Sequence, residues 1–300
     1  MLKKYISFIF VATLCGVLAN CATVNSVGAA PRIKTDLRVA SFNIHYLVLN
    51  DEEIKNWNAR KPAVTAMITD IDADILAFQE MESFGRGQGK NQNLQLDFVL
   101  QRHPDYAAAA YSDDADQYPI TQPIIYRKDR LEVLDQGFFF FSETPDVIYA
   151  RTFNGNWPAF CSWATFKDNF SGKTFTVFNM HTDYSSGSNR VQSSELMAAY
   201  ISPRVSRGES VLLVGDLNAS QSSKSAGILK DIPLSFVETS GSTFHFNRGI
   251  NLTPAIDHIL HTPDFTPLGN IRVIRQKYDG TWPGDHYPIV ADFRVKAGLP

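Results

Sequence analysis

A polar tetrapeptide follows an apolar run in the second half of the chain. Residues 211–214 read Val-Leu-Leu-Val, and Gly215, Asp216, Leu217 and Asn218 come directly after them. A short apolar run that ends at a glycine is typical of a buried strand, so the polar residues are expected at the rim of a sheet. Because side chains alternate along an extended segment, Asp216 and Asn218 are predicted to point the same way. This pair suits a phosphoryl centre, where the acid can orient or deprotonate water and the amide can donate to a developing oxyanion.

The sequence Gly-Asp-x-Asn is also common in turns, so its interpretation depends on which residues stand at the other strand ends. Polar groups stand next to five further apolar segments: Asn43, Glu80, His181 with Asp183, Asp257 with His258, and Asp285 with His286. Strand ends are rigid supports that can hold side chains in a fixed geometry. Carboxylates and histidines without cysteine predict a hard divalent cation, Mg²⁺ or Mn²⁺, rather than structural zinc.

Short strands and helices alternate over residues 37–296, and no internal repeat or linker divides them. Period-two and apolar segments predict strands at 37–44, 74–79, 123–126, 132–141, 161–166, 174–180, 211–214, 257–260, 270–274 and 289–295. Helical spacing predicts helices at 59–69, 94–102 and 191–201, and residues 82–92 read as a surface loop. The four aromatics at 138–141 are expected in a strand packed on both faces rather than in a membrane contact. The pattern favours an α/β fold with two packed sheets flanked by helices.

The first 21 residues have the pattern of a targeting signal. Lys3 and Lys4 precede a mostly apolar stretch that is too short to span a bilayer comfortably. Residues 18–21 read Leu-Ala-Asn-Cys, which resembles a lipobox in which Asn20 takes the place of a small residue. We therefore expect an exported protein that is either secreted after signal cleavage or tethered to the cell envelope through a lipidated Cys21. Residues 22–36 are predicted to be an exposed tether.

Charge and cysteine content limit the function classes. The chain carries a formal charge of −3, and removal of residues 1–21, which hold two lysines and no acid, brings it to −5. This net charge gives no sign of a basic face that would bind nucleic acid, although a net charge can hide a local basic patch. The three cysteines do not form a disulfide framework, because Cys15 and Cys21 belong to the signal. Cys161 lies among apolar residues, which predicts a buried structural thiol.

Six blocks occur in one order along the chain. They read Ser-Phe-Asn43-Ile, Phe-Gln-Glu80, Asn179-Met-His181-Thr-Asp183, Gly-Asp216-Leu-Asn218, Ile-Asp257-His-Ile and Gly-Asp285-His286-Tyr-Pro. This order resembles the endonuclease/exonuclease/phosphatase superfamily, the DNase I-like fold, over nearly the whole mature chain. The resemblance implies a four-layer α/β/β/α sandwich and a metal-dependent phosphoesterase that acts as a monomer.

The resemblance also implies roles for individual residues. Glu80 is the expected principal metal ligand, helped by Asn43 and Asp285. His286 is expected against the scissile phosphate with Asp257 holding its ring, and His181 at a phosphate oxygen. Asp216 is expected to orient or deprotonate the attacking water, and Asn218 to fix that geometry. Such a cleft requires Glu80 to lie within about 10 Å of Asp216 and His286, the reach of one ion and its bound phosphate.

Substrate contacts are predicted at Arg151, Arg190 and His245. The alternative for the two arginines is a surface or ion-pair role. His45, His103, His258 and His261 are expected to be structural or exposed, which is also the alternative for His245. Related secreted proteins often carry an arginine where this chain has Ala159, and a methyl group does not replace a guanidinium fork. The block around Asp257 does not resemble that of the inositol-phosphatase branch. A phosphodiesterase is therefore expected, acting on nucleic acid, a phospholipid or a small phosphodiester.

Three alternatives remain open at the level of sequence. A sphingomyelinase-like or phospholipase C-like enzyme agrees with export and requires membrane contacts, for which Trp157 and Trp282 are candidates. An extracellular nuclease is the second alternative. A non-catalytic binding protein on the same scaffold is the third, because a fold alone does not establish activity.

Overall fold

The structure is a computed structural model that describes residues 33–50, 55–81, 92–112, 114 and 116–296. The predicted signal, the predicted lipidation site Cys21, the predicted tether before residue 33 and residues 82–91 of the predicted loop lie outside the described residues. Among the residues described, no helix is long and apolar enough to cross a membrane.

Two β-sheets form the centre of the fold. The first has the order β11 (Phe265–Pro267), β13 (Ile289–Val295), β1 (Asp36–Asn43), β2 (Ile75–Gln79), β4 (Ile124–Arg127), β3 (Tyr106–Ala109), and β12 (Arg272–Val273) also pairs with β13. The second has the order β5 (Leu131–Phe140), β6 (Phe160–Asp168), β7 (Thr174–His181), β8 (Ser210–Asp216), β10 (Asp257–His261), β9 (Ser235–Phe236). β1 runs parallel to β2, and β7 runs parallel to β8, so the carboxyl ends of each pair lie at one edge.

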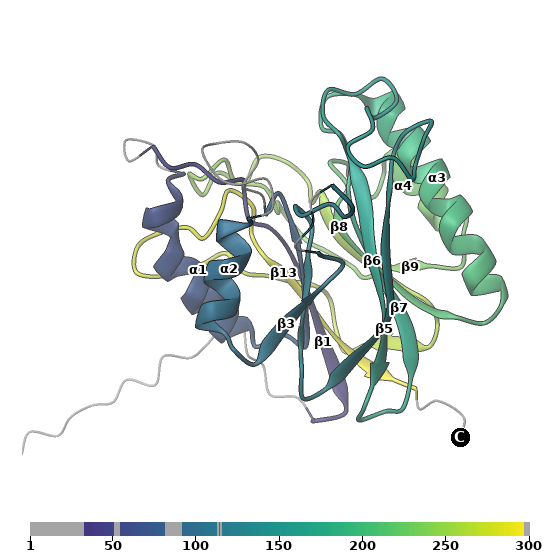
Figure 1. Cartoon of the computed structure of the whole chain (residues 1–300), viewed down its shortest axis with the longest axis horizontal. Helices are drawn as coiled ribbons and strands as arrows, with labels where there is room; N and C mark the ends of the chain where they lie inside the picture. Colours follow the sequence, from purple (N-terminus) through teal and green to yellow (C-terminus); the bar gives the residue numbers. More distant parts are fainter. Residues whose placement is uncertain (1–32, 51–54, 82–91, 113, 115, 297–300) are drawn as a thin grey trace, which may run out of the picture.

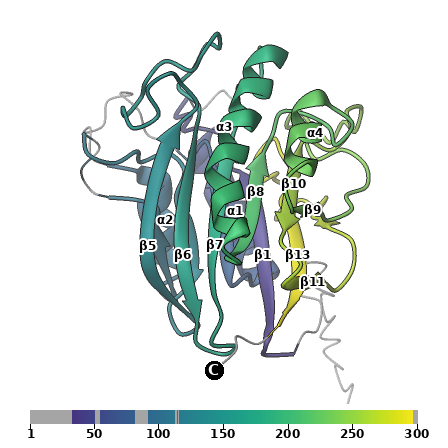
Figure 2. The same cartoon turned by 90° about the vertical axis from the view of Figure 1, so that its right-hand side faces the viewer.

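Helices cover the outer face of each sheet, as Figures 1 and 2 show. α1 (Trp57–Ile71) and α2 (Leu94–Arg102) pack on the first sheet, and α3 (Gly187–Ser206) and α4 (Lys224–Lys230) pack on the second. Each helix begins with a side chain that accepts a backbone N–H three residues on: Asn56, Asn93, Ser186 and Ser223. These caps satisfy N–H groups that have no partner inside the helix. The predicted α/β/β/α sandwich is confirmed.

All of the predicted strands and helices are present, and four further elements occur among the described residues. β3, β9, β11 and α4 were not predicted, because each is short or, like Tyr-Ala-Ala-Ala in β3, carries little strand signal. α3 extends to Ser206 through Pro203, beyond the predicted end at residue 201. Pro203 lies in the last turn, where it removes the hydrogen bond to the backbone oxygen of Ala199, and the helix ends three residues later.

Three apolar clusters separate the four layers. Two lie beneath the helices and one lies between the sheets. Phe139, Phe140 and Phe141 are fully buried, which confirms the core interpretation of the aromatic run. Cys161 is a buried free thiol, as predicted, and burial raises its pKa well above the usual range.

A buried arginine joins the two sheets at the edge opposite the polar strand ends. Arg130 is 2% exposed and forms ion pairs with Asp74 of the first sheet, at 2.9 Å, and with Asp168 of the second, at 3.1 Å. Its guanidinium also donates to the backbone oxygen of Asp36 at 2.6 Å. A planar guanidinium with five donors is suited to such a junction.

We expect Arg130→Met to lower the free energy of unfolding by about 3–5 kcal/mol, because it leaves Asp74 and Asp168 buried without their cation. Urea unfolding followed by circular dichroism measures this change. Arg294→Met removes a 60% exposed arginine from an ion pair with Asp36 and should cost about 1 kcal/mol or less. Equal losses in the two variants would contradict the assigned role of Arg130.

Candidate active site

The inner faces of the two sheets change from apolar to polar along the strands. On β8 the inward positions are Leu212, Val214 and then Asp216, and on β1 they are Leu37, Val39, Ser41 and Asn43. β2, β7 and β10 reach Gln79, His181 and Asp257 in the same way. The period of two therefore places the polar strand ends at one edge of the space between the sheets.

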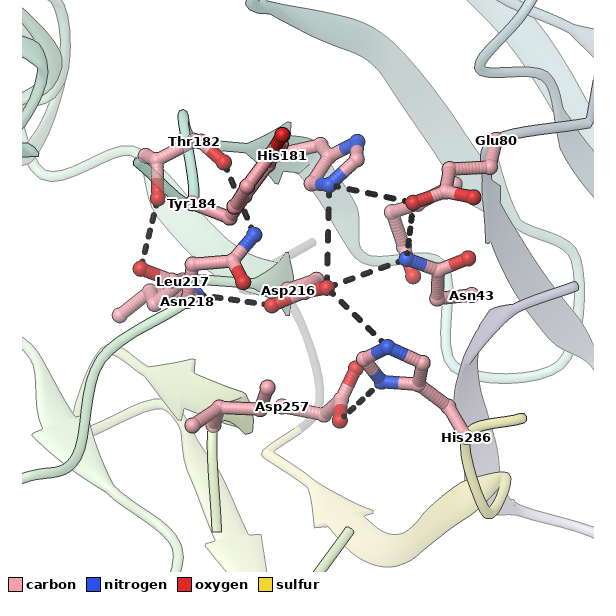
Figure 3. Close-up of polar contacts among 12 residues, drawn as sticks. Asn43, Glu80, His181, Thr182, Tyr184, Asp216, Leu217, Asn218, Asp257 and His286 are labelled. Atoms are coloured by element: carbon pink, nitrogen blue, oxygen red, sulfur yellow. Dashed lines mark hydrogen bonds and ion pairs between the residues drawn. The ribbon is translucent and has the colours of Figure 1, made fainter. Parts of the chain in front are cut away.

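The carboxylate of Asp216 lies at the centre of these groups (Figure 3). Its Oδ2 atom accepts a hydrogen bond from Asn43 Nδ2 at 3.1 Å and lies 3.7 Å from His181 Nε2 and 3.6 Å from His286 Nε2. Its Oδ1 atom accepts the backbone N–H of Asn218 at 2.7 Å. Burial, followed by the charge of Asp257, raises the pKa of Asp216, while the two imidazoles and the Asn218 N–H oppose that rise.

Local backbone geometry explains the Gly-Asp-Leu-Asn sequence. Gly215 has a φ of +139°, and a Cβ atom there would collide with the backbone oxygen of Met180 on β7. The predicted strand alternation does not extend to Asn218, because β8 ends at Asp216 and Asn218 has a φ of 45°. The Asn218 side chain instead donates to the backbone oxygen of Thr182 at 2.9 Å, which holds the loops after β7 and β8 together.

His286 and Asp257 form a buried pair beside Asp216. Asp257 Oδ2 lies 2.9 Å from His286 Nδ1, which fixes the ring and leaves Nε2 directed at Asp216. Burial alone would lower the pKa of His286, but the charges of Asp257 and Asp216 and the hydrogen bond to Asp257 raise it to about 10. The imidazole is therefore protonated and positively charged at neutral pH.

Glu80, Asn43 and His181 form the more open side of the cluster. Asn43 Nδ2 donates to Glu80 Oε1 at 3.0 Å, and His181 Nε2 lies 3.8 Å from the same oxygen. The Glu80 and His181 side chains are 28% and 23% exposed, whereas that of Asp216 is 1% exposed. Glu80 follows β2 with a φ of 55°, which turns its side chain toward the cluster. The short contacts that link Glu80, Asp216 and His286 through Asn43 and His181 agree with the expected common cleft.

Asp285 lies at one side of this cluster with two partners that the sequence did not reveal. Its Oδ2 atom is 3.0 Å from Lys55 Nζ and 3.7 Å from His45 Nε2. His286, His45 and Lys55 lower the pKa of Asp285 against the effect of burial. His45 Nδ1 lies 3.1 Å from the Tyr46 backbone oxygen, and Lys55 lies 2.9 Å from Nε2, so Nδ1 carries the proton and Nε2 accepts. Lys55 stands outside every strand-end motif, so only the fold could identify it.

The three predicted substrate contacts have different surroundings, and His245 is next to the site, because its backbone N–H donates to the Asp285 backbone oxygen at 2.9 Å. The His245 side chain is fully buried against Trp282 and Tyr287, so the structure does not bring it to an open face of the site, and burial lowers its pKa to about 4. Arg190 NH1 donates to the backbone oxygens of Asp183 and Tyr184, which occupies that nitrogen. Arg151 is exposed in the loop between β5 and β6. Contacts of Arg151 and Arg190 with a substrate stay predictions.

Two sets of donor atoms have the chemistry of a metal site. Asp216, Asp257 and His286 offer atoms within 4.8 Å of one another, all buried. The protonated imidazole of His286 disfavours this set, because a histidine must be neutral to bind a metal. Glu80 offers a carboxylate on the more exposed side, a hard ligand that fits Mg²⁺ or Mn²⁺. The neighbouring Asn43 turns its Nδ2 atom to Glu80, and its Oδ1 atom accepts the His45 N–H at 3.1 Å, so its ligand role stays a prediction. Asp285 is already paired with an ammonium group, and its ligand role stays a prediction.

Known proteins resemble this chain in sequence and in fold. Residues 40–286 match the Endonuclease/Exonuclease/phosphatase family. A mannosyl-6-phosphatase from Bacteroides thetaiotaomicron is 26% identical, with 86% of this chain and 99% of that chain covered and a TM-score of 0.74. An endonuclease/exonuclease/phosphatase from Bacteroides vulgatus is also 26% identical, over 87% and 100% of the two chains, with a TM-score of 0.73. D. rerio TDP2 complexed with single strand DNA product shares the fold at 16% identity, over 86% and 99%, with a TM-score of 0.62. A comparison with curated proteins gave no significant match.

A buried histidine next to the site makes the fold sensitive to acid. Burial lowers the pKa of His258 from 6.5 to about 4, and the ring is fully buried with its Nε2 atom 2.9 Å from the Ala219 backbone oxygen. Because the folded pKa is lower than the unfolded one, this contribution to stability is complete above pH 6.5 and is lost as the pH falls toward 4.

We expect wild type to lose about 2 kcal/mol more unfolding free energy than His258→Gln between pH 7.5 and 4.5. The glutamine amide can still donate to Ala219 but does not titrate. Urea unfolding at both pH values measures the difference. The same pH dependence in both proteins would show that His258 does not titrate with folding.

Proposed function

Because this chain belongs to the endonuclease/exonuclease/phosphatase family, whose members are hydrolases of phosphoesters, we propose that it hydrolyses a phosphodiester with a divalent cation. The observation that carries this proposal is the buried Asp216 carboxylate between two imidazoles and beside the Asn43–Glu80 pair. These groups supply a carboxylate to activate water, a positively charged ring to stabilise the phosphoryl oxygens and hard ligands for a divalent cation. Hydrolysis at phosphorus uses all three.

Each residue has a role that follows from its surroundings. Asp216, whose pKa is raised by burial, accepts a proton from water as the water oxygen bonds to phosphorus. The protonated His286, held by Asp257, and His181 donate to phosphoryl oxygens that gain charge. Asn218 fixes the loop that positions Asp216. Glu80 and Asn43, with Asp285 as a further ligand, would hold the divalent cation, which would supply positive charge to the phosphate and to its leaving group.

The charge of the site favours a diester over a monoester. Four carboxylates, those of Glu80, Asp216, Asp257 and Asp285, face three fixed cations: Lys55, His286 and the buried Arg60, which interacts with Asp285 and Glu80. With one divalent ion, this set carries one net positive charge, which a diester neutralises and a monoester exceeds. A diester carries one negative charge near pH 7 and a monoester carries close to two, so the monoester meets the less favourable electrostatic environment.

A phosphosugar monoester is the second candidate, and the mannosyl-6-phosphatase supports it. That protein shares 26% identity over 86% of this chain. Export and a lipid tether at Cys21 remain proposals that rest on residues 1–21, and neither is required for the chemistry.

We expect the protein to hydrolyse bis(p-nitrophenyl) phosphate with Mg²⁺ or Mn²⁺ and to lose that activity in EDTA. Glu80→Gln and His286→Asn should each lower kcat/KM about 100-fold or more, because each removes a charged group that acts at the phosphate. His261→Asn is the matched control, since His261 lies at the opposite end of β10 from Asp257. It should retain turnover within about twofold. Turnover that persists in EDTA, or in both site variants, would contradict the proposal.

The ester class is decided by a substrate panel at saturating Mg²⁺. We expect kcat/KM for bis(p-nitrophenyl) phosphate to exceed that for p-nitrophenyl phosphate and mannose 6-phosphate at least tenfold, because the diester neutralises the charge of the site. A reversed ratio would support the phosphosugar phosphatase. Turnover of sphingomyelin vesicles or single-stranded DNA above all of these would favour the lipid or nuclease alternative. Binding of Mn²⁺ without turnover of any substrate would favour a binding protein.

A further inference from the structure

A layer of uncharged amides lies between the apolar core and the charged site. On β7 the inward side chains run from Val177 through Asn179 to His181, and on β1 from Val39 through Ser41 to Asn43. On β2, Gln79 lies between Ala77 of the apolar core and Glu80 of the site. All members of this layer are nearly inaccessible to water: Ser41, Gln79, Gln122 and Asn179 are 2% exposed or less.

The layer contains a direct hydrogen bond between the two sheets. Gln79 Nε2 on β2 donates to Asn179 Oδ1 on β7 at 2.7 Å. The same Gln79 nitrogen lies 3.0 Å from Ser41 Oγ on β1. Asn179 Nδ2 in turn donates to the backbone oxygens of Phe78, at 2.8 Å, and Gln122, at 3.2 Å. Each amide is thus held in one orientation by several partners.

Both bridging residues are neighbours of site residues in sequence. Gln79 directly precedes Glu80, and Asn179 lies two residues before His181 on the same face of β7. The site itself is divided in the same way, because Asn43 and Glu80 come from the first sheet and His181 and Asp216 come from the second. Glu80 Oε1 and His181 Nε2 are 3.8 Å apart across that division.

Apolar contacts between sheets do not fix a distance as a hydrogen bond does, because hydrophobic burial has no direction. We propose that the Gln79–Asn179 hydrogen bond is a positioning contact that sets the separation of the two halves of the site, and thereby its affinity for the divalent cation and its rate. This inference rests on the proposed function. Gln79 and Asn179 touch neither substrate nor ion and act only through Glu80 and His181.

If the Gln79–Asn179 hydrogen bond only stabilised the fold, stability and site geometry would change together in every variant, which differs from what a positioning role predicts. Gln79→Met keeps the length of the side chain but leaves Asn179 Oδ1 buried without its donor, which should destabilise the fold. The double variant Gln79→Met/Asn179→Leu removes both partners and should recover part of that stability, since a matched apolar pair can be nearly neutral. It does not restore a directional contact between the sheets.

The experiment measures three quantities on each variant: Mn²⁺ affinity by calorimetry without substrate, kcat and KM for the diester, and the urea midpoint. We expect Gln79→Met and the double variant to bind Mn²⁺ at least tenfold more weakly and to lower kcat at least tenfold, even where the urea midpoint of the double variant recovers. Thr176→Val is the matched control. It removes the 2.8 Å hydroxyl pair of Thr176 and Thr165 on neighbouring strands β7 and β6, and should leave Mn²⁺ affinity and kcat within twofold.

Recovery of Mn²⁺ affinity and kcat together with stability in the double variant would overturn the positioning role, as would wild-type affinity and rate in Gln79→Met. In both cases an active wild type leaves the proposed function intact. A wild type that neither binds Mn²⁺ nor hydrolyses any ester overturns the proposed function and this inference together.

Discussion

The Asp216 carboxylate is buried between two sheets, and the loss of its hydration must be offset by the groups around it. Its partners come from four strand ends or the loops next to them: Asn43, His181, His286 and the backbone of Asn218. None of these can move far without leaving the acid uncompensated. The requirement for a paired buried charge therefore holds the site and this edge of the sandwich together.

Along the strands, the space between the sheets is lined first by apolar, then by amide and then by charged side chains. The apolar part supplies free energy of folding but no orientation, whereas the amides of Gln79 and Asn179 are directional. At the opposite edge, Arg130 joins the sheets through Asp74 and Asp168. Polar contacts thus join the sheets at both ends of the sandwich. Those of Arg130 are ionic and remote from the site, and those of the amides are neutral and lie beneath the Asn43–Asp216 hydrogen bond of the site itself.

Local pattern was sufficient for most elements and for the strand-end residues. The periods of apolar residues identified β1, β2, β7, β8, β10 and β13, and the period of two explains why Asn43, His181 and Asp216 face one space. The pattern failed where a strand stopped, as at Asn218, and where a residue belongs to no motif, as at Lys55. His245 was expected near the substrate, but aromatic packing on Trp282 and Tyr287 buries it.

By itself the sequence determined which residue types stand at the strand ends, the resemblance of their order to one family, and the four layers that follow from it. Those features depend on neighbouring residues or on the order of blocks along the chain, so they can be read from the sequence. The tertiary structure alone decided that Lys55 pairs with Asp285, that Asp216 lies between two imidazoles, and that Gln79 meets Asn179. These pairs are separated by 35 to 230 positions along the chain. Strand pairing within a sheet brings His181 to Asp216, and the packing of one sheet on the other brings Gln79 to Asn179.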